Sequence, residues 1–322
     1  MKAIEIRGDE LAWVEVEDPS PGVGEILIRN QATAVNRADL VQRAGAYPPP
    51  PGASPILGLE CAGVVEALGE GVGRFAVGDP VCALLAGGGY AERVVCPAAQ
   101  ALPIPGGTSP VDAAALPEVF ATAYLNLYQE AGARVGERVL LHAGASGVGT
   151  AGIQLARAFG NPVWVTAGSP EKIARCIELG AAGGHVRHAG PFVDSVKAWT
   201  DGAGMDVILD PVGGAYLADD IASLAVGGRL VVIGLMGGAK AELPLGIALV
   251  KRLRIIGSTL RARSVAEKAE VMEGLERRVW PRIASGEIRP IVEARMPITE
   301  AARAHELLAS DATFGKVLLI LD

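Results

Sequence analysis

The chain has 322 residues, of which 50% are hydrophobic and 20% are charged, and its formal net charge is −7. A length of this order usually gives two domains with enough apolar residues for buried cores, which excludes a disordered or fibrous chain. The acidic balance argues against a nucleic-acid-binding protein, because binding to phosphates needs clustered Lys and Arg. No apolar stretch approaches the roughly 20 residues needed to cross a bilayer, so we expect no membrane span.

The four cysteines, Cys61, Cys82, Cys96 and Cys176, are dispersed and form no C-x-x-C pair. This spacing favours reduced, buried thiols over a disulfide framework or a zinc ribbon. The first residues lead directly into a strand pattern with no leader signature, so the expected location is cytoplasmic. The 42 glycines indicate many tight turns, which strand and helix units with short loops require.

Up to about Leu116, short strand patterns alternate with turn signals, and helical periodicity is weak. Strands this short with turns this frequent predict a small, barrel-like β unit. The expected strands span residues 1–7, 25–34, 62–67, 80–85 and 90–96.

A helical stretch over residues 111–127 leads into a regular alternation of strands and helices. The strands are nearly continuous apolar runs, which indicates a parallel sheet covered by helices on both faces. We therefore expect a doubly wound domain. Its strands are predicted at residues 138–142, 162–167, 206–210, 229–234 and 254–259, and its helices at residues 149–159, 171–179, 192–200, 216–223 and 246–251.

The tail contains a helical stretch over residues 264–285, a strand over 289–296, a capped helix that starts near Thr299, and a last apolar strand over 316–321. A terminal strand this apolar needs a partner, and the first β unit is the expected host. The predicted arrangement is an α/β chain in which a doubly wound domain, residues 119–261, is inserted into a discontinuous β-rich domain, residues 1–118 and 262–322.

The most informative segment is a glycine-containing turn, AGASGVG at residues 143–149, between a predicted strand and a predicted helix. The spacing departs from G-x-G-x-x-G, but the strand, turn and helix context that the motif requires is present. Small residues let the backbone approach a pyrophosphate, and the start of the helix offers N–H groups to the anion. We expect a dinucleotide to bind here.

The residues that follow the next predicted strand, 162–167, indicate which dinucleotide binds. An NAD-binding domain usually places Asp or Glu there, on the ribose 2′-hydroxyl, whereas this chain has Gly168, Ser169 and then Lys172. A hydroxyl and a cation suit a 2′-phosphate, so NADPH is the expected cofactor. The alternative is that Ser169 only caps a helix and Lys172 is a solvated surface residue.

Taken together, several motifs resemble the zinc-free branch of the medium-chain dehydrogenases/reductases, specifically the quinone oxidoreductase (zeta-crystallin-like) family. The resemblance covers essentially the whole chain and implies a GroES-like β-rich domain plus a Rossmann domain. The motifs are AVNRADL (34–40), GAYPP (45–49), GLECAG (58–63), VGDPV (77–81), AGASGVG (143–149), IGLMG (233–237) and GSTLRAR (257–263).

The resemblance also bears on metals. Zinc-dependent relatives place a Cys, a His and a second Cys where this chain has Asn36, Leu59 and Glu118. Neither Asn nor Leu is a credible replacement for a thiolate or imidazole ligand, so we expect no catalytic or structural zinc. A quinone is electrophilic enough to accept hydride without a Lewis acid, provided that the nicotinamide is held against it.

The resemblance further implies the cofactor contacts. Residues along the nicotinamide and its ribose are expected to include Thr122, Gly234, Leu235, Met236 and Asn36, completed by Leu260, Arg261, Phe314 and Lys316. The pyrophosphate is expected to meet Ser146, Gly147 and Val148, and the adenosine end Gly168, Ser169 and Lys172. Close relatives carry a Tyr after the third strand of the Rossmann domain; this chain does not, and Arg187 is expected to supply charge there instead.

The candidate catalytic residues are Tyr47, to hydrogen-bond a quinone oxygen and assist protonation, and Asn36, to orient the substrate or the ribose. The alternative for Tyr47 is an aromatic lid on a Pro-rich loop. His142 is expected to be a satisfied core residue and His305 to lie on a tail helix, neither with partners that suggest a triad or a metal site.

The function expected from these residues and the resemblance is NADPH-dependent reduction of quinones. Reduction of 2-enones or enoyl thioesters is an alternative with the same hydride geometry. An alternative of another class is a nucleotide-binding regulatory protein without turnover, for which single-strand nucleic-acid binding is disfavoured by the acidic charge and few aromatics. The resemblance also implies a homodimer formed through a Rossmann-sheet edge, with residues 240–245 or their neighbours as the candidate strand.

Overall fold

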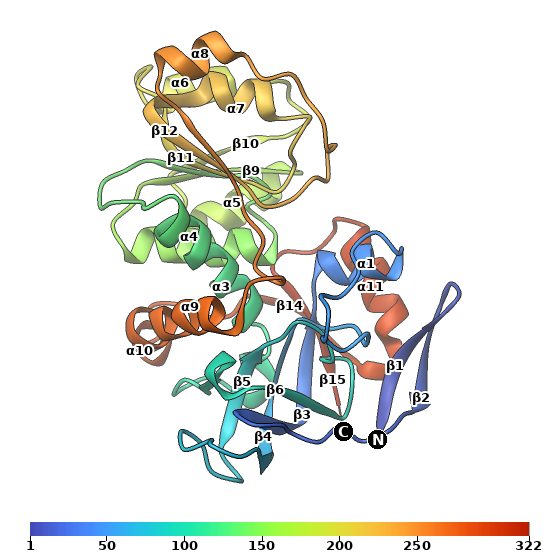
Figure 1. The fold of residues 1–322 in the computed structure, drawn as a ribbon. Helices are drawn as coiled ribbons and strands as arrows, with labels where there is room; N and C mark the ends of the chain where they lie inside the picture. The colour runs from blue at the N-terminus through green and yellow to red at the C-terminus, as the bar shows by residue number, and fades with distance from the viewer. Residues whose placement is uncertain (322) are drawn as a thin grey trace. The chain divides into compact units, whose positions relative to one another are not determined.

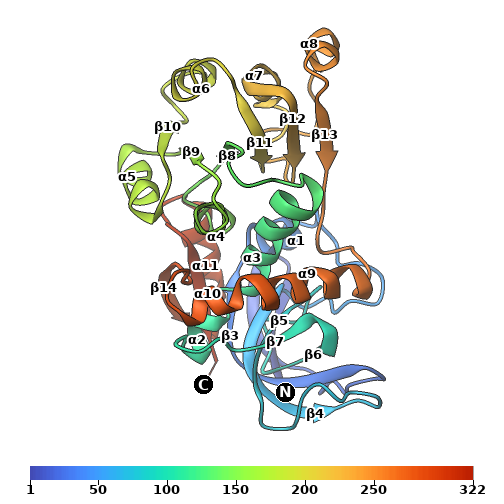
Figure 2. The same ribbon diagram turned by 90° about the vertical axis from the view of Figure 1, so that its left-hand side faces the viewer.

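A computed structural model of the chain describes residues 1–321, and it divides into two compact units. The first unit comprises residues 1–121 and 260–322, and the second comprises residues 122–259 (Figures 1 and 2). The sequence suggested divisions at 118/119 and 261/262, whereas the units divide at 121/122 and 259/260. No helix in residues 1–321 is long and apolar enough to cross a membrane.

The first unit contains two sheets. Strands β1 (Lys2–Arg7) and β2 (Glu10–Glu15) form an antiparallel pair joined by a turn at Gly8. Strand β2 was not predicted from the sequence. The larger, seven-stranded sheet has the order β14-β15-β3-β4-β5-β7, with β6 also paired to β3. Its strands are β3 (Glu25–Val35), β4 (Glu60–Leu68), β5 (Pro80–Leu84), β6 (Arg93–Pro97), β7 (Ala101–Pro103), β14 (Val292–Pro297) and β15 (Lys316–Ile320).

The last strand of the chain pairs with the first β unit, as the sequence predicts. Strand β15 lies antiparallel to β3, with Val317 opposite Val35 and Ile320 opposite Ala32. The pairing buries Val317, Leu318 and Leu319 completely. The two ends of the sequence therefore build one domain, and this pairing brings residues about 280 positions apart into contact.

The helices of the first unit differ from the prediction at two places. Helix α1 (Arg37–Arg43) was not predicted; it is short, and Asn36 and Asp39 form a capping box at its start. The predicted helix over 111–127 is three pieces, α2 (Pro110–Ala113), α3 (Pro117–Tyr124) and a π-helical segment (Leu125–Glu130), because Pro117 starts a new helix. The tail forms α9 (Val265–Arg278), α10 (Trp280–Ala284), a short 3₁₀ turn (Ile298–Glu300) and α11 (Ala301–Ala309).

The second unit is the doubly wound domain that the sequence predicts. Its parallel sheet has the order β10-β9-β8-β11-β12-β13, so the chain runs outward from β8 in one direction and then from β11 in the other. The strands are β8 (Val139–Leu141), β9 (Val163–Ala167), β10 (Gly183–Val186), β11 (Met205–Asp210), β12 (Leu224–Val232) and β13 (Arg254–Gly257). In such sheets the ligand crevice lies at the carboxyl ends of the strands where the order reverses, here β8 and β11.

Helices cover both faces of this sheet (Figure 2). Helix α4 (Gly147–Ala158) packs beside α5 (Pro170–Leu179), and α6 (Val193–Trp199) packs beside α7 (Leu217–Ser223). Helix α8 (Leu245–Val250) precedes the edge strand β13. The predicted edge strand at 240–245 is wrong: residues 240–244 form no strand, and β13 occupies the edge.

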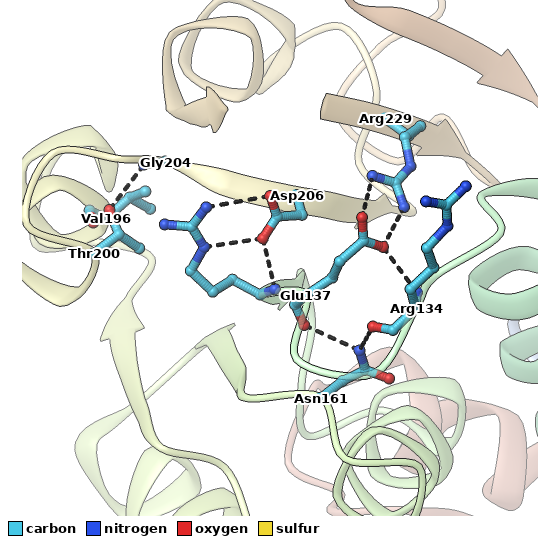
Figure 3. Close-up of polar contacts among 9 residues, drawn as sticks. Arg134, Glu137, Asn161, Val196, Thr200, Gly204, Asp206 and Arg229 are labelled. Atoms are coloured by element: carbon cyan, nitrogen blue, oxygen red, sulfur yellow. Dashed lines mark hydrogen bonds and ion pairs between the residues drawn. The ribbon is translucent and has the colours of Figure 1, made fainter. Parts of the chain in front are cut away.

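The amino-terminal side of the sheet is fixed by a polar network (Figure 3). Asp206 accepts hydrogen bonds from the backbone N–H and the Nε of Arg138, at 2.8 and 2.9 Å. Glu137 forms a bidentate ion pair with Arg229, at 2.5 and 3.1 Å. The side-chain amide of Asn161 donates to the Arg134 and Glu137 carbonyls. These bonds tie β8, β11 and β12 together at the end opposite the turns that follow them.

Candidate active site

The turn after β8 has a backbone that few sequences allow. Ala143 adopts a φ of 54°, in the left-handed region that residues other than glycine rarely occupy. A Cβ on Gly144 would lie 2.6 Å from the Val165 Cβ, and one on Gly149 would lie 2.5 Å from the Ala143 carbonyl oxygen. The small residues of the motif are therefore required by close packing. The turn has the tight geometry of a phosphate-binding turn.

Helix α4 starts where this turn ends. The Ser146 Oγ caps the helix and accepts the Gly149 N–H at 3.0 Å. The N–H groups of Gly147 and Val148, at the first two helical positions, have no acceptor within a helix. These donors and the positive end of the helix dipole suit a pyrophosphate, so the three residues predicted from the sequence lie together and fit a dinucleotide.

Two further glycine turns follow β11 and β12 at the same edge of the sheet. Asp210, at the end of β11, accepts the Val212 and Gly213 N–H groups at 2.6 and 2.8 Å. The second turn is bonded to the first through the Gly237 N–H and the Val212 carbonyl, at 2.7 Å, and a Cβ on Gly234 would lie 2.6 Å from the Pro211 carbonyl oxygen.

The apolar side chains of this second turn face outward. Leu235 is 58% exposed and Met236 is 56% exposed, although both are large and hydrophobic. Two exposed apolar side chains after β12, beside the strand ends where the sheet order reverses, suit a surface for a flat, uncharged ring. Thr122, the first residue of the second unit, is half-buried on α3.

The adenosine end of the predicted site lies at the carboxyl ends of β9 and β10. Ser169 caps α5, accepting the Lys172 N–H at 3.3 Å, so the capping role considered from the sequence is present. The guanidinium of Arg187 lies 3.8 Å from where a Gly168 Cβ would be, and its Nε donates to His188 at 2.9 Å. Positive charge therefore lies beside Gly168, next to the Ser169 cap.

His142 is a buried core residue with both ring nitrogens hydrogen-bonded, as the sequence predicts, and one of its partners is a carboxyl. Its Nε2 lies 2.7 Å from Asp220 Oδ1, and its Nδ1 lies 3.0 Å from the Thr166 hydroxyl. Both side chains are fully buried, and burial raises the pKa of Asp220 while His142 opposes that rise. No local pattern reveals the pair, because the two residues are 78 positions apart on different elements.

In the first unit, the predicted residues Asn36 and Lys316 meet a carboxylate that the sequence did not single out, Glu60. The Lys316 ammonium lies 2.8 Å from Glu60 Oε1 and 2.6 Å from Asn36 Oδ1, and it also donates to the Val35 carbonyl at 3.0 Å. Asn36 Nδ2 donates to the same Glu60 oxygen at 3.0 Å. The Lys316 and Glu60 side chains are 4% and 0% exposed, so this is a buried ion pair with a fixed amide beside it.

Two more carboxyls lie around this ion pair. Asp39 accepts the Asn36 and Gly58 N–H groups at 2.8 and 3.1 Å, and burial raises the pKa of Asp39 to about 6. Glu118 lies in the first turn of α3 and donates its backbone N–H to Glu60 Oε2 at 2.9 Å. Burial and the nearby Glu60 charge raise the pKa of Glu118 to about 8. Two of the three positions compared with zinc ligands, Asn36 and Glu118, thus lie beside the buried Glu60–Lys316 ion pair.

Tyr47 is held by Arg261. The guanidinium lies over the Tyr47 ring at 5.2 Å from its centroid and donates to the Tyr47 carbonyl at 3.3 Å. It also donates to Gln42 Oε1 and the Ala86 carbonyl, at 2.7 and 2.8 Å. Burial and the Glu118 charge raise the pKa of the Tyr47 hydroxyl, while Arg261 opposes the rise. Arg261 therefore holds both the ring and the backbone of Tyr47.

The predicted site residues fall into two groups. In the first unit, the predicted residues Leu260 and Phe314 are also buried. Within residues 1–321, no group of three or more His, Cys, Asp or Glu side chains is arranged to hold a metal ion. The first unit holds Asn36, Tyr47, Leu260, Arg261, Phe314 and Lys316; the second holds Thr122, Ser146, Gly147, Val148, Gly168, Ser169, Lys172, Arg187, Gly234, Leu235 and Met236.

Comparison with known families gives two matches. Residues 22–106 match the alcohol dehydrogenase GroES-like domain, and residues 147–277 match the zinc-binding dehydrogenase family. The chain is 32% identical to quinone oxidoreductase of Rattus norvegicus over 325 residues, which cover all of this chain and 97% of that protein. It is 33% identical to phthioceranic/hydroxyphthioceranic acid synthase of Mycobacterium tuberculosis over 96% of this chain, but it spans only 14% of that longer protein.

Solved structures agree with this fold over the whole chain. A mycobacterial protein in complex with NADPH superimposes with a TM-score of 0.88 at 31% identity, covering 100% of both chains. The JamJ enoyl reductase superimposes with a TM-score of 0.88 at 26% identity, covering 100% of this chain and 99% of that one.

Proposed function

Because the chain belongs to the medium-chain dehydrogenase/reductase family, with a GroES-like and a Rossmann domain, we propose that it is an NADPH-dependent quinone reductase that works without a metal. The observation that carries the proposal is the tight turn before α4, at the strand ends where the sheet order reverses, in a chain that matches a quinone oxidoreductase along its full length. NADPH, when bound, supplies hydride. The protein's own residues would bind the dinucleotide, orient the quinone and help to protonate it.

The second unit is proposed to bind the dinucleotide. The α4 N–H groups of Gly147 and Val148 would hold the pyrophosphate, with Ser146 fixing the start of the helix. Ser169, Lys172 and Arg187 would hold the 2′-phosphate, which supports NADPH over NADH because the strand end carries no carboxylate. Leu235 and Met236 would line the nicotinamide ring with apolar surface that is otherwise exposed.

The first unit is proposed to bind and orient the quinone. Tyr47 would donate a hydrogen bond to a quinone oxygen, since Arg261 fixes its position. Both polar atoms of the Asn36 amide are already bonded, one to Lys316 and one to Glu60, so its proposed role is orientation of the substrate or ribose. The positive charge of Lys316 is paired with Glu60, so we assign Lys316 to holding this amide in place.

A homodimer in the cytoplasm is part of the same proposal. The edge strand β13 has Ile255 42% exposed, and the adjoining α8 exposes Leu249 and Val250. An unpaired, partly apolar strand edge suits pairing with a second copy of the sheet. Light scattering that gives a monomer mass at micromolar concentration would contradict this part of the proposal.

Reduction of an enoyl compound is the second candidate, favoured by the likeness to the JamJ enoyl reductase over the whole chain. Hydride would then go to carbon rather than to a quinone. The test measures NADPH oxidation with a set of ortho- and para-quinones beside a set of 2-enones, with metal analysis of the same preparation. Turnover of enones alone favours the second candidate, and NADPH binding without any turnover favours a regulatory protein.

A further inference from the structure

A cavity of about 1340 Å³ lies within the first unit, and every residue that lines it belongs to that unit. Its wall is formed by parts of β1 and β6, the loop over residues 50–56, the segment over residues 85–88 and the start of α9. Apolar side chains, among them Ile56 and Leu85, make up part of this wall. A cavity with such a wall suits a ligand that has an apolar body.

The cavity wall contains a buried cation without a partner, Lys268 on α9. The residue is only 4% exposed, and within residues 1–321 its ammonium forms no hydrogen bond or ion pair. Its Nζ is not among the unbonded polar atoms that are sealed from solvent, so solvent reaches this ammonium at the cavity that Lys268 lines. An almost buried ammonium is unfavourable unless an anion joins it, which makes Lys268 a point where a negatively charged ligand gains most.

The other charged residues of the wall have partners or are exposed. Arg261 donates to Gln42 Oε1 at 2.7 Å, and Arg263 lies 3.6 Å from Glu267. Of the remaining four, Arg93 pairs with Glu66, Glu5 pairs with Arg7, Glu25 accepts the Gly22 N–H, and Glu17 is exposed. Lys268 is therefore the one buried charge of this wall whose side chain has no partner in the described part of the chain.

The charges near Lys268 do not neutralise it by direct contact. Burial lowers the pKa of Lys268; the charges of Glu118 and Glu267 oppose this decrease, and Arg261 adds to it. Glu267 is bonded elsewhere, because its carboxylate accepts the Ser264 backbone N–H and hydroxyl at 2.9 and 2.7 Å in the capping box of α9. Two acids thus attract Lys268 from a distance, one guanidinium repels it, and none of the three is hydrogen-bonded to it.

The start of α9 adds a second feature that favours an anion. Val265 is the first residue of this 14-residue helix and lies in the cavity wall. The first N–H groups of a helix have no acceptor within it, and the positive end of the helix dipole attracts negative charge. Lys268 follows three residues later, on the same face of the helix as Val265.

We propose that this cavity binds a ligand with one anionic group, a carboxylate or a phosphate, on an apolar body, and that the Lys268 ammonium pairs with the anionic group. The start of α9 would attract the same group, and the apolar body would lie against Ile56 and Leu85. Binding requires neither a dinucleotide nor turnover, so the site goes beyond the quinone reductase function proposed above.

The binding test uses three probes with the same alkyl chain, decanoate, decyl phosphate and decanol, in calorimetry with the purified chain in phosphate-free buffer. The wild type should bind at least one of the two anions about tenfold or more tightly than decanol, the usual gain from one charge-assisted hydrogen bond. Lys268→Met should lower the affinity for that anion about tenfold or more and leave the affinity for decanol unchanged. Lys268→Arg should keep the preference for the anion, and Lys240→Met, at an exposed position of the second unit, should match the wild type.

Hydrogen exchange measured by mass spectrometry locates the site and shows whether each variant is folded. The tighter anion should slow exchange in residues 50–56 and at the start of α9 in the wild type and not in Lys268→Met, with β3 and β15 exchanging alike in both. Tighter binding of decyl phosphate supports a phosphate ligand, tighter binding of decanoate supports a carboxylate, and equal binding supports a site for either.

Three results overturn the proposal whether or not the chain reduces quinones. The first is that neither anion binds the wild type at millimolar concentration more tightly than decanol does. The second is that a folded Lys268→Met variant binds the anion as the wild type does. The third is that the anion slows exchange only in segments outside the cavity wall.

Discussion

Replacing Lys316 with methionine removes the only cation bonded to Glu60 within residues 1–321. Methionine fills most of the space of the lysine stem, so the change removes charge with little loss of volume. Glu60 would keep the Asn36 amide at 3.0 Å and the Glu118 N–H at 2.9 Å, but it would remain a fully buried, unpaired carboxylate. The Val35 carbonyl and Asn36 Oδ1 would also lose their donor.

The expected cost is about 3–5 kcal/mol, the usual range for removing one partner of a buried ion pair. Because the chain has two units, a single melting temperature would not locate the effect. Hydrogen exchange measured by mass spectrometry reports each segment separately, and we expect faster exchange of β3 and β15 in the first unit with unchanged exchange in β8 and β11.

The double variant Lys316→Met with Glu60→Gln tests the reasoning. Removing both charges should cost about 0.5–3 kcal/mol less than the sum of the two single changes, because the unpaired carboxylate is gone. Lys240→Met, at an exposed position, is the matched control and should leave exchange unchanged. If Lys316→Met costs no more than this control, the ion pair does not stabilise the unit.

Three further predictions concern the cofactor turn, cofactor choice and pH. Gly149→Ala should weaken NADPH binding by calorimetry about tenfold or more, since its Cβ would lie 2.5 Å from the Ala143 oxygen, whereas Gly246→Ala, in open space, should bind normally. Lys172→Ala should raise KM for NADPH and leave KM for NADH unchanged; an equal rise for both would remove the 2′-phosphate assignment. Folding raises the pKa of Asp39 from 3.8 to about 6, so the folded chain holds this proton at a higher pH than the unfolded chain does. The protonated carboxyl therefore contributes stability below about pH 4, and this contribution is lost as the pH rises from about 4 to 6. Urea denaturation of Asp39→Asn should lack that slope, and an unchanged slope would show that another group causes it.

The features predicted correctly are those that depend on residues close together in the sequence. The turn at Gly144 and Gly149 sits between an apolar strand and a helix, so strand, turn and helix are all visible within about 20 residues. The pairing of β15 followed from its apolar composition, because such a strand needs a partner.

The features that were missed depend on contacts between distant residues. Glu60 and Lys316 are 256 positions apart, and His142 and Asp220 are 78 apart, so neither pair has a sequence signature. Helix α1 is only seven residues long and has too few turns for periodicity to register. The candidate edge strand at residues 240–245 was taken from the family resemblance, but that segment leads into α8 instead.

The most direct test of the proposed function is the rate of NADPH oxidation by purified protein with a simple ortho-quinone and a para-quinone, measured beside NADH with the same acceptors and beside 2-enones. The account predicts rapid, metal-independent turnover of at least one quinone with a clear preference for NADPH. Equal rates with NADPH and NADH, or turnover of 2-enones without turnover of any quinone, would contradict it.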